Sequence, residues 1–188
     1  FLTQGLVLDA GKEYLLVINR NNDGDIFIFD RKTGKGVRKI NRQGQGGEEY
    51  ARINDLILDE SNGEIFVESL GNKILVYDLY GSFKRVLNLD REVSSVFNYD
   101  KHNLICYDMS DYHNKGKDRT RSYHVIISKQ DGSVTREIFI PFKTINTPIA
   151  VDGDQFVASY SYQIRLSHDE WTLIETSSDT LYHYAPDG

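Results

Sequence analysis

The stretch IFIFDRKTG, Ile26–Gly34, sets the pattern of this chain: a short alternating run of apolar residues ends in a polar turn that a glycine closes. The pattern returns in ILVYDLYG (Ile74–Gly81), VIISKQDG (Val125–Gly132) and LYHYAPDG (Leu181–Gly188). The closing glycines lie 47, 51 and 56 residues apart. Repeats of this length that consist of strands are typical of the blades of a β-propeller.

Tight turns divide the first two repeats into four short strands each. In the first repeat we expect strands at Gly5–Asp9, Tyr14–Asn19, Asp25–Asp30 and Gly36–Asn41. The separator Asn21–Gly24 favours a hairpin because Asn and Gly tolerate the positive φ of tight turns. The spacing leaves no room for a helix. The sequence therefore predicts an all-β fold, a β-propeller with four-stranded antiparallel blades.

The repeats predict one propeller domain over residues 1–188, with blades at roughly 5–41, 53–89, 94–140 and 149–188. The last blade stops one strand short, so about three and three-quarter blades are present. Blades must close into a ring to protect the edges of their sheets. Because Phe1–Gln4 is too short to supply the missing strand, we expect this chain to be part of a larger ring. Closure as four blades is the alternative.

Composition limits the classes of partner. The net charge of −6 argues against non-specific binding to nucleic acid or to an anionic membrane, which needs a basic face. No apolar run approaches the roughly 18 residues of a membrane span, so we expect no membrane insertion of this segment. The single cysteine, Cys106, lies in an apolar strand pattern, which favours a small buried hydrophobe.

The linker between the first two repeats, NRQGQGGEEYAR at residues 41–52, has no periodicity but carries a motif. It matches Gly-x-Gly-Pro-x-Glu-Tyr at Gly44, Gly46, Glu49 and Tyr50, with Gly47 in place of proline. With FIFDRKTGK before it and IFVESLGNKILVYDLYGSFKR after it, the linker resembles the six-bladed, NHL-like β-propeller proteins of Bacteroides-type bacteria. The resemblance implies a six-bladed ring, of which this chain supplies somewhat over half. It also implies an exported or lipid-anchored envelope protein, in the periplasm or at the cell surface.

Two polar insertions interrupt the later repeats, at Met109–Ser122 and over roughly Tyr162–Asp179. Both are expected to join strands 2 and 3 of their blades and to emerge on the same face as the linker Gly44–Tyr50. Loops gathered on one face of a rigid scaffold are common binding sites, although polar loops also simply tolerate insertion. The candidate ligand-binding residues on this loop face are Tyr50, Glu49, Tyr112, Arg119, Arg121, Tyr162, Arg165 and Trp171.

Each group of candidates also has a structural interpretation. The cations of the first insertion suit an acidic glycan, a phosphate or a carboxylate, or else belong to a solvated loop. The aromatic and cationic residues of the second suit stacking on sugar rings or on a partner surface, or else Trp171 and its apolar neighbours hold the loop down. Tyr50 either joins an acidic rim or packs against the next blade, with Glu49 making local hydrogen bonds.

The sequence contains no Gly-x-Ser-x-Gly, no Cys-x-x-Cys and no histidine pair with ligand spacing. Asn19–Asp30 matches part of the calcium-loop template, but its flanking strands favour a hairpin. We therefore predict no catalytic residue, no metal ligand and no cofactor. The interpretation is a non-catalytic envelope module that binds a glycan, a peptide or a protein. The alternative is a metal-assisted lactonase or lyase with a divalent cation in the central channel, as in some related six-bladed propellers.

Overall fold

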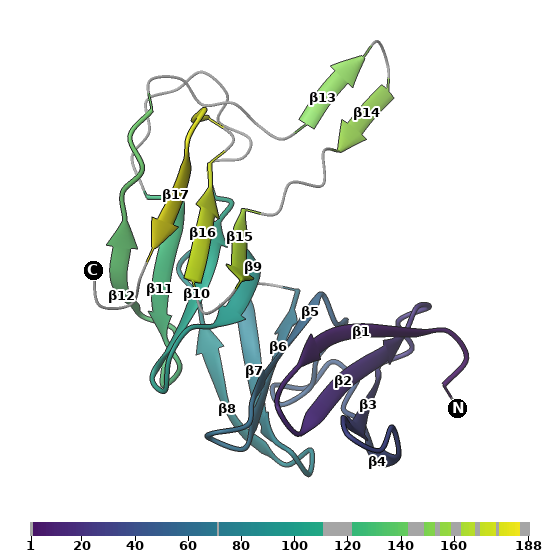
Figure 1. Ribbon diagram of the computed structural model, residues 1–188. Helices are drawn as coiled ribbons and strands as arrows, with labels where there is room; N and C mark the ends of the chain where they lie inside the picture. Colours follow the sequence, from purple (N-terminus) through teal and green to yellow (C-terminus); the bar gives the residue numbers. More distant parts are fainter. Residues whose placement is uncertain are drawn as a thin grey trace. The chain divides into compact units, whose positions relative to one another are not determined.

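The computed structural model describes residues 2–70, 72–110, 122–142, 149–152, 155–158, 163–167, 170–175 and 177–184. Over these residues the chain forms strands and turns only (Figure 1), so this part of it holds no helix that could cross a membrane. Its contacts divide it into two compact units. Unit 1 comprises Phe1–Asp90, Phe97–Leu104 and Ser128–Ser133, and unit 2 comprises Arg91–Val96, Ile105–Ile127 and Val134–Gly188.

The first repeat forms a four-stranded antiparallel sheet in unit 1. Its strands, in spatial order, are β1 (Gly5–Ala10), β2 (Tyr14–Asn19), β3 (Asp25–Asp30) and β4 (Gly36–Asn41). The predicted strands are confirmed, and β1 runs one residue further than expected. Asn22 and Gly24 in the β2–β3 turn have φ values of 52° and 80°. The positive φ expected from this turn sequence is therefore present.

The second repeat forms an equivalent sheet in the same unit. Its strands, again in spatial order, are β5 (Asp55–Asp59), β6 (Glu64–Ser69), β7 (Lys73–Asp78) and β8 (Phe83–Asn88). Gly63 and Gly81 close two of its turns with φ values of 63° and 84°. This regular meander agrees with the prediction of four strands joined by tight turns.

The two sheets of unit 1 share one apolar core. Side chains alternate between the faces of a strand, so every second residue of β2, β3 and β5 points into the space between the sheets. There Leu16 and Ile26 of the first sheet join Leu56 and Leu58 of the second, and all four are almost fully buried. Burying each such side chain stabilises the fold by about 2 kcal/mol. This core holds the first strands of the two sheets, β1 and β5, beside each other.

The third repeat forms a four-stranded antiparallel sheet with the order β12-β11-β10-β9. Its strands are β9 (Val93–Asn98), β10 (Asn103–Asp108), β11 (His124–Ser128) and β12 (Val134–Ile138). Cys106 in β10 is fully buried, as its apolar surroundings predicted. Most of the Met109–Ser122 insertion lies outside the described residues. Three consecutive four-stranded sheets thus confirm the predicted all-β class.

The fourth repeat differs from the prediction. β13 (Ile149–Asp152) pairs with β14 (Gln155–Ala158), and a separate antiparallel sheet contains β15 (Ile164–Ser167), β16 (Glu170–Ile174) and β17 (Leu181–Tyr184). The prediction of a loop over 162–179 is therefore wrong, because β15 and β16 lie inside it. The physical reason is an alternation of apolar and polar residues on both strands. It buries Ile164, Trp171 and Leu173 on one side of the hairpin.

The outer strands of the three complete sheets share one detail of register. In each sheet an arginine faces the third strand just before a β-bulge, in the pairs Arg38↔Ile28, Arg85↔Val76 and Arg136↔Ile126. Each arginine reaches the following repeat, and each such pair lies within one unit. The Arg38 guanidinium lies 3.9 Å from the Tyr80 ring centroid, Arg85 Nε donates to the Lys129 carbonyl at 2.8 Å, and Arg136 Nη1 donates to Tyr184 Oη at 2.7 Å.

Candidate functional site

Asp9 lies near the end of β1 and joins this strand to β5. Its Oδ2 accepts a hydrogen bond from the Leu58 N–H at 2.7 Å, and its Oδ1 accepts one from the Ala10 N–H at 2.8 Å. Neither contact brings a positive charge to the carboxylate. Burial raises the pKa of Asp9 above its ordinary value, and the charge of Glu60 adds to the rise.

Asp55 begins β5 and is the second carboxylate on these two strands. Its Oδ1 accepts a hydrogen bond from the Leu56 N–H at 2.8 Å. Burial, with a smaller contribution from the charge of Asp9, raises the pKa of Asp55 to about 6. The side chain is therefore mostly ionised at neutral pH and takes up a proton in mildly acidic solution.

The other buried carboxylates of unit 1 have cations beside them. Glu64 accepts two hydrogen bonds of 2.8 Å from Arg85 and pairs with Lys84, and Asp59 lies 2.6 Å from Lys129. Burial opposes ionisation of both groups, but the hydrogen bonds from these cations lower the pKa of each. Within the described residues, Asp9 and Asp55 have no such cation. Among the described residues, the fold therefore provides cations for one set of carboxylates and none for this pair.

We call Asp9 and Asp55 the inner carboxylate pair, because each lies on the first strand of its sheet, β1 or β5. Carboxylates without a cation accept hydrogen bonds from ligand hydroxyl or ammonium groups, or supply oxygens to a divalent cation. The described residues hold no group of three or more His, Cys, Asp or Glu arranged for a metal ion. A metal at the pair would need ligands from elsewhere.

Tyr50 and Glu49, two of the predicted ligand-binding residues, serve the linker itself. Tyr50 is fully buried; its hydroxyl accepts a hydrogen bond from the Arg42 N–H at 2.9 Å and donates one to the Gly24 carbonyl at 2.7 Å. Its ring meets Tyr77 edge to face with a centroid distance of 6.0 Å. Glu49 Oε2 accepts a hydrogen bond from the Gly46 N–H at 2.8 Å. These contacts agree with the structural interpretation of the motif, in which Tyr50 packs against the next repeat and Glu49 makes local hydrogen bonds.

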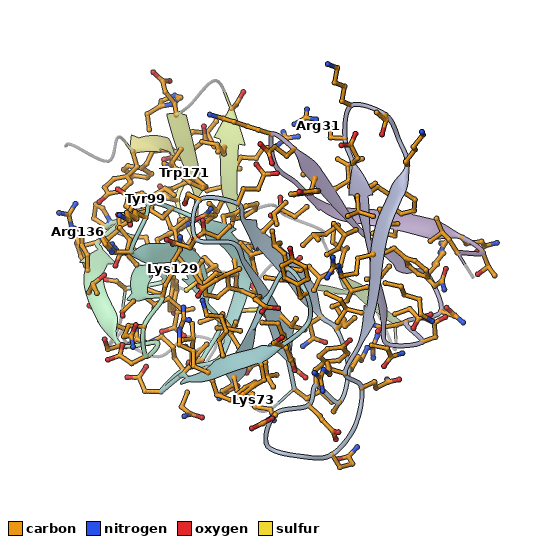
Figure 2. The ribbon with its side chains drawn as sticks, turned by 90° about the horizontal axis from the view of Figure 1, so that it is seen from below. Arg31, Lys73, Tyr99, Lys129, Arg136 and Trp171 are labelled. Carbon is orange, nitrogen blue, oxygen red and sulfur yellow. The ribbon has the colours of Figure 1, made fainter. Side chains whose placement is uncertain are left out.

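Arg165 and Trp171, the described candidates of the second insertion, lie on opposite faces of the β15–β17 sheet. Arg165 pairs with Thr172, whereas Trp171 pairs with Leu166, and adjacent pairs point to opposite sides. Trp171 is buried (Figure 2) and Arg165 is exposed. The structure therefore does not bring them together on one surface. Tyr112, Arg119, Arg121 and Tyr162 lie outside the described residues.

Sequence reasoning missed the inner carboxylate pair. One signal was available for Asp9: its strand ends in Leu-Val-Leu-Asp, and the corresponding strand of the second repeat ends in Leu-Ile-Leu-Asp at Asp59. The repeat shows where a strand ends but not which carboxylate receives a cation. No comparable pattern marks Asp55, which precedes its apolar run.

The chain matches, over residues 2–188, the model of a family described as 6-bladed beta-propeller (DUF5128). A protein of Bacteroides fragilis described as exported superposes with a TM-score of 0.62 at 17% sequence identity, covering 97% of this chain and 52% of the other. A member of the DUF4221 family from Bacteroides vulgatus gives a TM-score of 0.54 at 14% identity, covering 98% of this chain and 58% of the other. At these identities the two structures share the fold alone.

The chain thus spans little more than half the length of these two solved structures. No curated protein matches it significantly in sequence.

Proposed function

Because the chain belongs to this family of six-bladed β-propellers, we propose that it is part of a non-catalytic binding module of the bacterial cell envelope. The module recognises a glycan, a peptide or another protein through the face that carries the 109–122 segment and the strands within 162–179. Export to the periplasm or the cell surface is part of the proposal, and the exported Bacteroides fragilis protein of the same fold supports it.

The observation that carries this proposal is the two-sided sheet β15–β17, of which β15 and β16 lie inside the second segment and β17 follows it. One side is anchored by buried Trp171 and Leu173. On the other side the register places Arg165, Thr172 and His183 in one row across the three strands. A sheet with an apolar anchor holds its outward groups in place, so binding loses less conformational entropy than it would on an unstructured loop.

The chemistry of this row suits a ligand that carries carboxylate or hydroxyl groups. Arg165 is exposed and offers a planar fork of donors that matches a carboxylate. His183 Nδ1 lies 3.9 Å from Glu170 Oε2, and both side chains are 71% exposed. The row thus combines a cation, a hydroxyl and an imidazole–carboxylate pair on one surface.

The test uses the purified protein on a panel of immobilised bacterial and plant polysaccharides and on a random peptide library. We expect retention of at least one class of ligand, and a loss of at least tenfold in affinity for the Arg165→Ala/His183→Ala variant. Lys101→Ala, which changes an exposed residue of unit 1, is the matched control and keeps the wild-type affinity. Thermal melting checks that the variants fold. The proposal fails if nothing is retained, or if the double variant binds as the wild type does.

The inner carboxylate pair favours a second candidate function, a metal-assisted lactonase or lyase with a site at the central channel. Its test is calorimetric titration with Ca²⁺, Mg²⁺ and Mn²⁺, comparing the wild type with Asp55→Asn. Stoichiometric uptake that Asp55→Asn abolishes favours this function. A protein indifferent to all three ions, and to chelator in thermal melting, counts against it.

A further inference from the structure

The segment from Arg31 to Gly47 contains six basic residues and no acidic one, although the chain as a whole has a net charge of −6. We name these residues the basic edge: Arg31, Lys32, Lys35, Arg38, Lys39 and Arg42. Glu48 ends the run. This segment therefore carries a local excess of positive charge, although the net charge of the chain is negative.

The basic edge occupies the β3–β4 turn, the outer strand β4 of the first sheet and the residue that follows this strand, Arg42. Residues 31–37 are all exposed, as are Lys39 and Arg42, and Arg38 is half-buried. Arg31 extends from the end of this sheet (Figure 2). An outer strand lies at the rim of a propeller blade, so these side chains face solvent rather than a neighbouring strand.

Most of the basic edge carries charge that the fold does not neutralise. Lys39 pairs with Asp25 at 2.8 Å. Among the described residues the other five have no acidic partner: Arg31 donates to the Gly11 carbonyl, and Arg42 Nε donates to the Gly81 carbonyl at 2.9 Å. These contacts orient the arginines without cancelling their charge.

In the second sheet, the basic residues of the outer strand have an acidic partner. Its outer strand has Lys84 and Arg85, and both pair with Glu64, the first residue of β6. The corresponding first residue of β2 is Tyr14, which offers no carboxylate. The first sheet therefore lacks the acidic partner that the second sheet provides.

An exposed aromatic ring adjoins this charge. Tyr80 is 73% exposed, and Arg38 stacks against it at 3.9 Å from the centroid. The turn that bears Tyr80 lies against the end of β4, since Nε of Arg42, the residue after this strand, donates a hydrogen bond to the Gly81 carbonyl. Stacking on Tyr80 holds the guanidinium in place and leaves most of the ring accessible. An exposed aromatic ring with two oriented arginines beside it, Arg38 and Arg42, suits a flat ligand that carries negative charge.

We propose that the basic edge and Tyr80 bind an acidic glycan, with uronate carboxylates on the cations and a sugar ring on Tyr80. Arginine matches carboxylate with two parallel hydrogen bonds, which gives the site specificity as well as charge. A nucleic acid carries about one charge per 1.7 Å of duplex, so the negative remainder of this chain repels it more strongly than it repels a glycan with one charge per sugar. The site uses none of the residues of the β15–β17 row, so its fate is separate from that of the proposed function.

The test measures binding of oligogalacturonate to the purified protein by calorimetry, with neutral dextran as the uncharged probe. We expect oligogalacturonate to bind and dextran not to bind. Lys32→Gln/Lys35→Gln lowers the affinity about tenfold, as expected for two lost charge contacts. The matched control, Lys73→Gln/Lys101→Gln, removes two charges from the second and third repeats of unit 1, away from the basic edge, and leaves the affinity unchanged.

Tyr80→Ala separates stacking from charge, and its expected effect is a further loss of binding with the cations intact. The proposal is overturned if the wild type does not bind oligogalacturonate, or if the two lysine variants lose affinity equally. It is also overturned if single-stranded DNA, or vesicles of phosphatidylcholine and phosphatidylglycerol, bind more tightly through the same residues. Arg165→Ala/His183→Ala keeps full oligogalacturonate binding, so the outcome does not depend on the β15–β17 row.

Discussion

Lys129 Nζ lies 2.6 Å from Asp59 Oδ2, although the two residues are 70 positions apart in the chain. Their side chains are 5% and 0% exposed. The ammonium also donates to Asn98 Oδ1 at 2.6 Å and to the Asp100 carbonyl, which uses all three of its hydrogens. These contacts fix the turn that follows β11, in the third repeat, to β5, the first strand of the second repeat.

Lys129→Met is expected to lower the free energy of unfolding by about 3–5 kcal/mol, because it leaves the Asp59 carboxylate buried without its cation. Urea denaturation at pH 7 measures the change. Burial opposes ionisation of Asp59, but the hydrogen bond from Lys129 lowers the pKa of Asp59 below its ordinary value of 3.8. The ion pair therefore stabilises the fold fully above pH 3.8, and this stabilisation is lost as the pH falls through the lowered pKa. The difference from the wild type should therefore shrink in strong acid. Lys101→Met is the control, and equal stability of the two variants would contradict the assignment.

Asp55→Asn is expected to stabilise the protein at pH 8 by on the order of 2 kcal/mol. With a pKa raised from 3.8 to about 6, Asp55 holds its proton more tightly in the folded chain than in the unfolded one. The wild type therefore loses stability as the pH rises from about 4 to about 6, and the neutral variant escapes this loss. Urea denaturation at pH 4 and pH 8 checks the sign, with Glu48→Gln on the exposed linker as control. A variant less stable than the wild type at pH 8 would show that a cation compensates Asp55.

Tyr50→Phe is expected to cost about 1–3 kcal/mol, because it leaves the Arg42 N–H and the Gly24 carbonyl without the hydroxyl that joins them. Tyr80→Phe removes the same atom from an exposed ring and should change stability little. Thermal or urea denaturation of the two variants makes the comparison. Equal effects would mean that the Tyr50 hydroxyl does not hold the linker.

Gly81→Ala is expected to destabilise the fold more than Gly34→Ala does. Both glycines have positive φ, 84° and 69°, which costs an alanine about 1–2 kcal/mol. A methyl group on Gly81 would also lie 2.8 Å from Ile40 Cγ2, whereas nothing lies within 4 Å at Gly34. The difference between the two midpoints of denaturation thus isolates the contact with Ile40. If the two variants are equally stable, Ile40 moves aside without cost.

The strands of the first two sheets could be predicted because their signals are local. Alternation of apolar residues fixes each strand, and Asn-Asp-Gly at 22–24 and the glycines at 34 and 81 fix the turns. The same rule was not applied over 162–179, where we expected an insertion although the runs at 164–167 and 170–174 alternate. Counting the alternation on either side of the turn would have given the hairpin β15–β16.

The candidate site was harder to predict because burial and charge depend on residues from other repeats. Tyr50 and Trp171 are aromatic residues in polar surroundings along the chain, and only their distant neighbours decide that both are buried. Asp59 and Asp55 lie in one strand, yet Lys129 pairs with the first alone. Conversely, the basic edge is visible in the sequence, but Arg38 lacks the acidic partner that Arg85 has because Tyr14 stands where the second sheet has Glu64.

The bulges of the outer strands bear on how this protein behaves when it is concentrated. An outer strand exposes a row of unpaired backbone N–H and C=O groups, on which a second molecule could add its own strand. In β4, β8 and β12 the register shifts next to an arginine, at Ile28/Phe29, Val76/Tyr77 and Ile126/Ile127 on the partner strands. The bulge twists the row of backbone groups and the arginine adds charge, so both features oppose pairing between two such strands. The sheets are thereby protected from the edge-to-edge growth that ends in fibres.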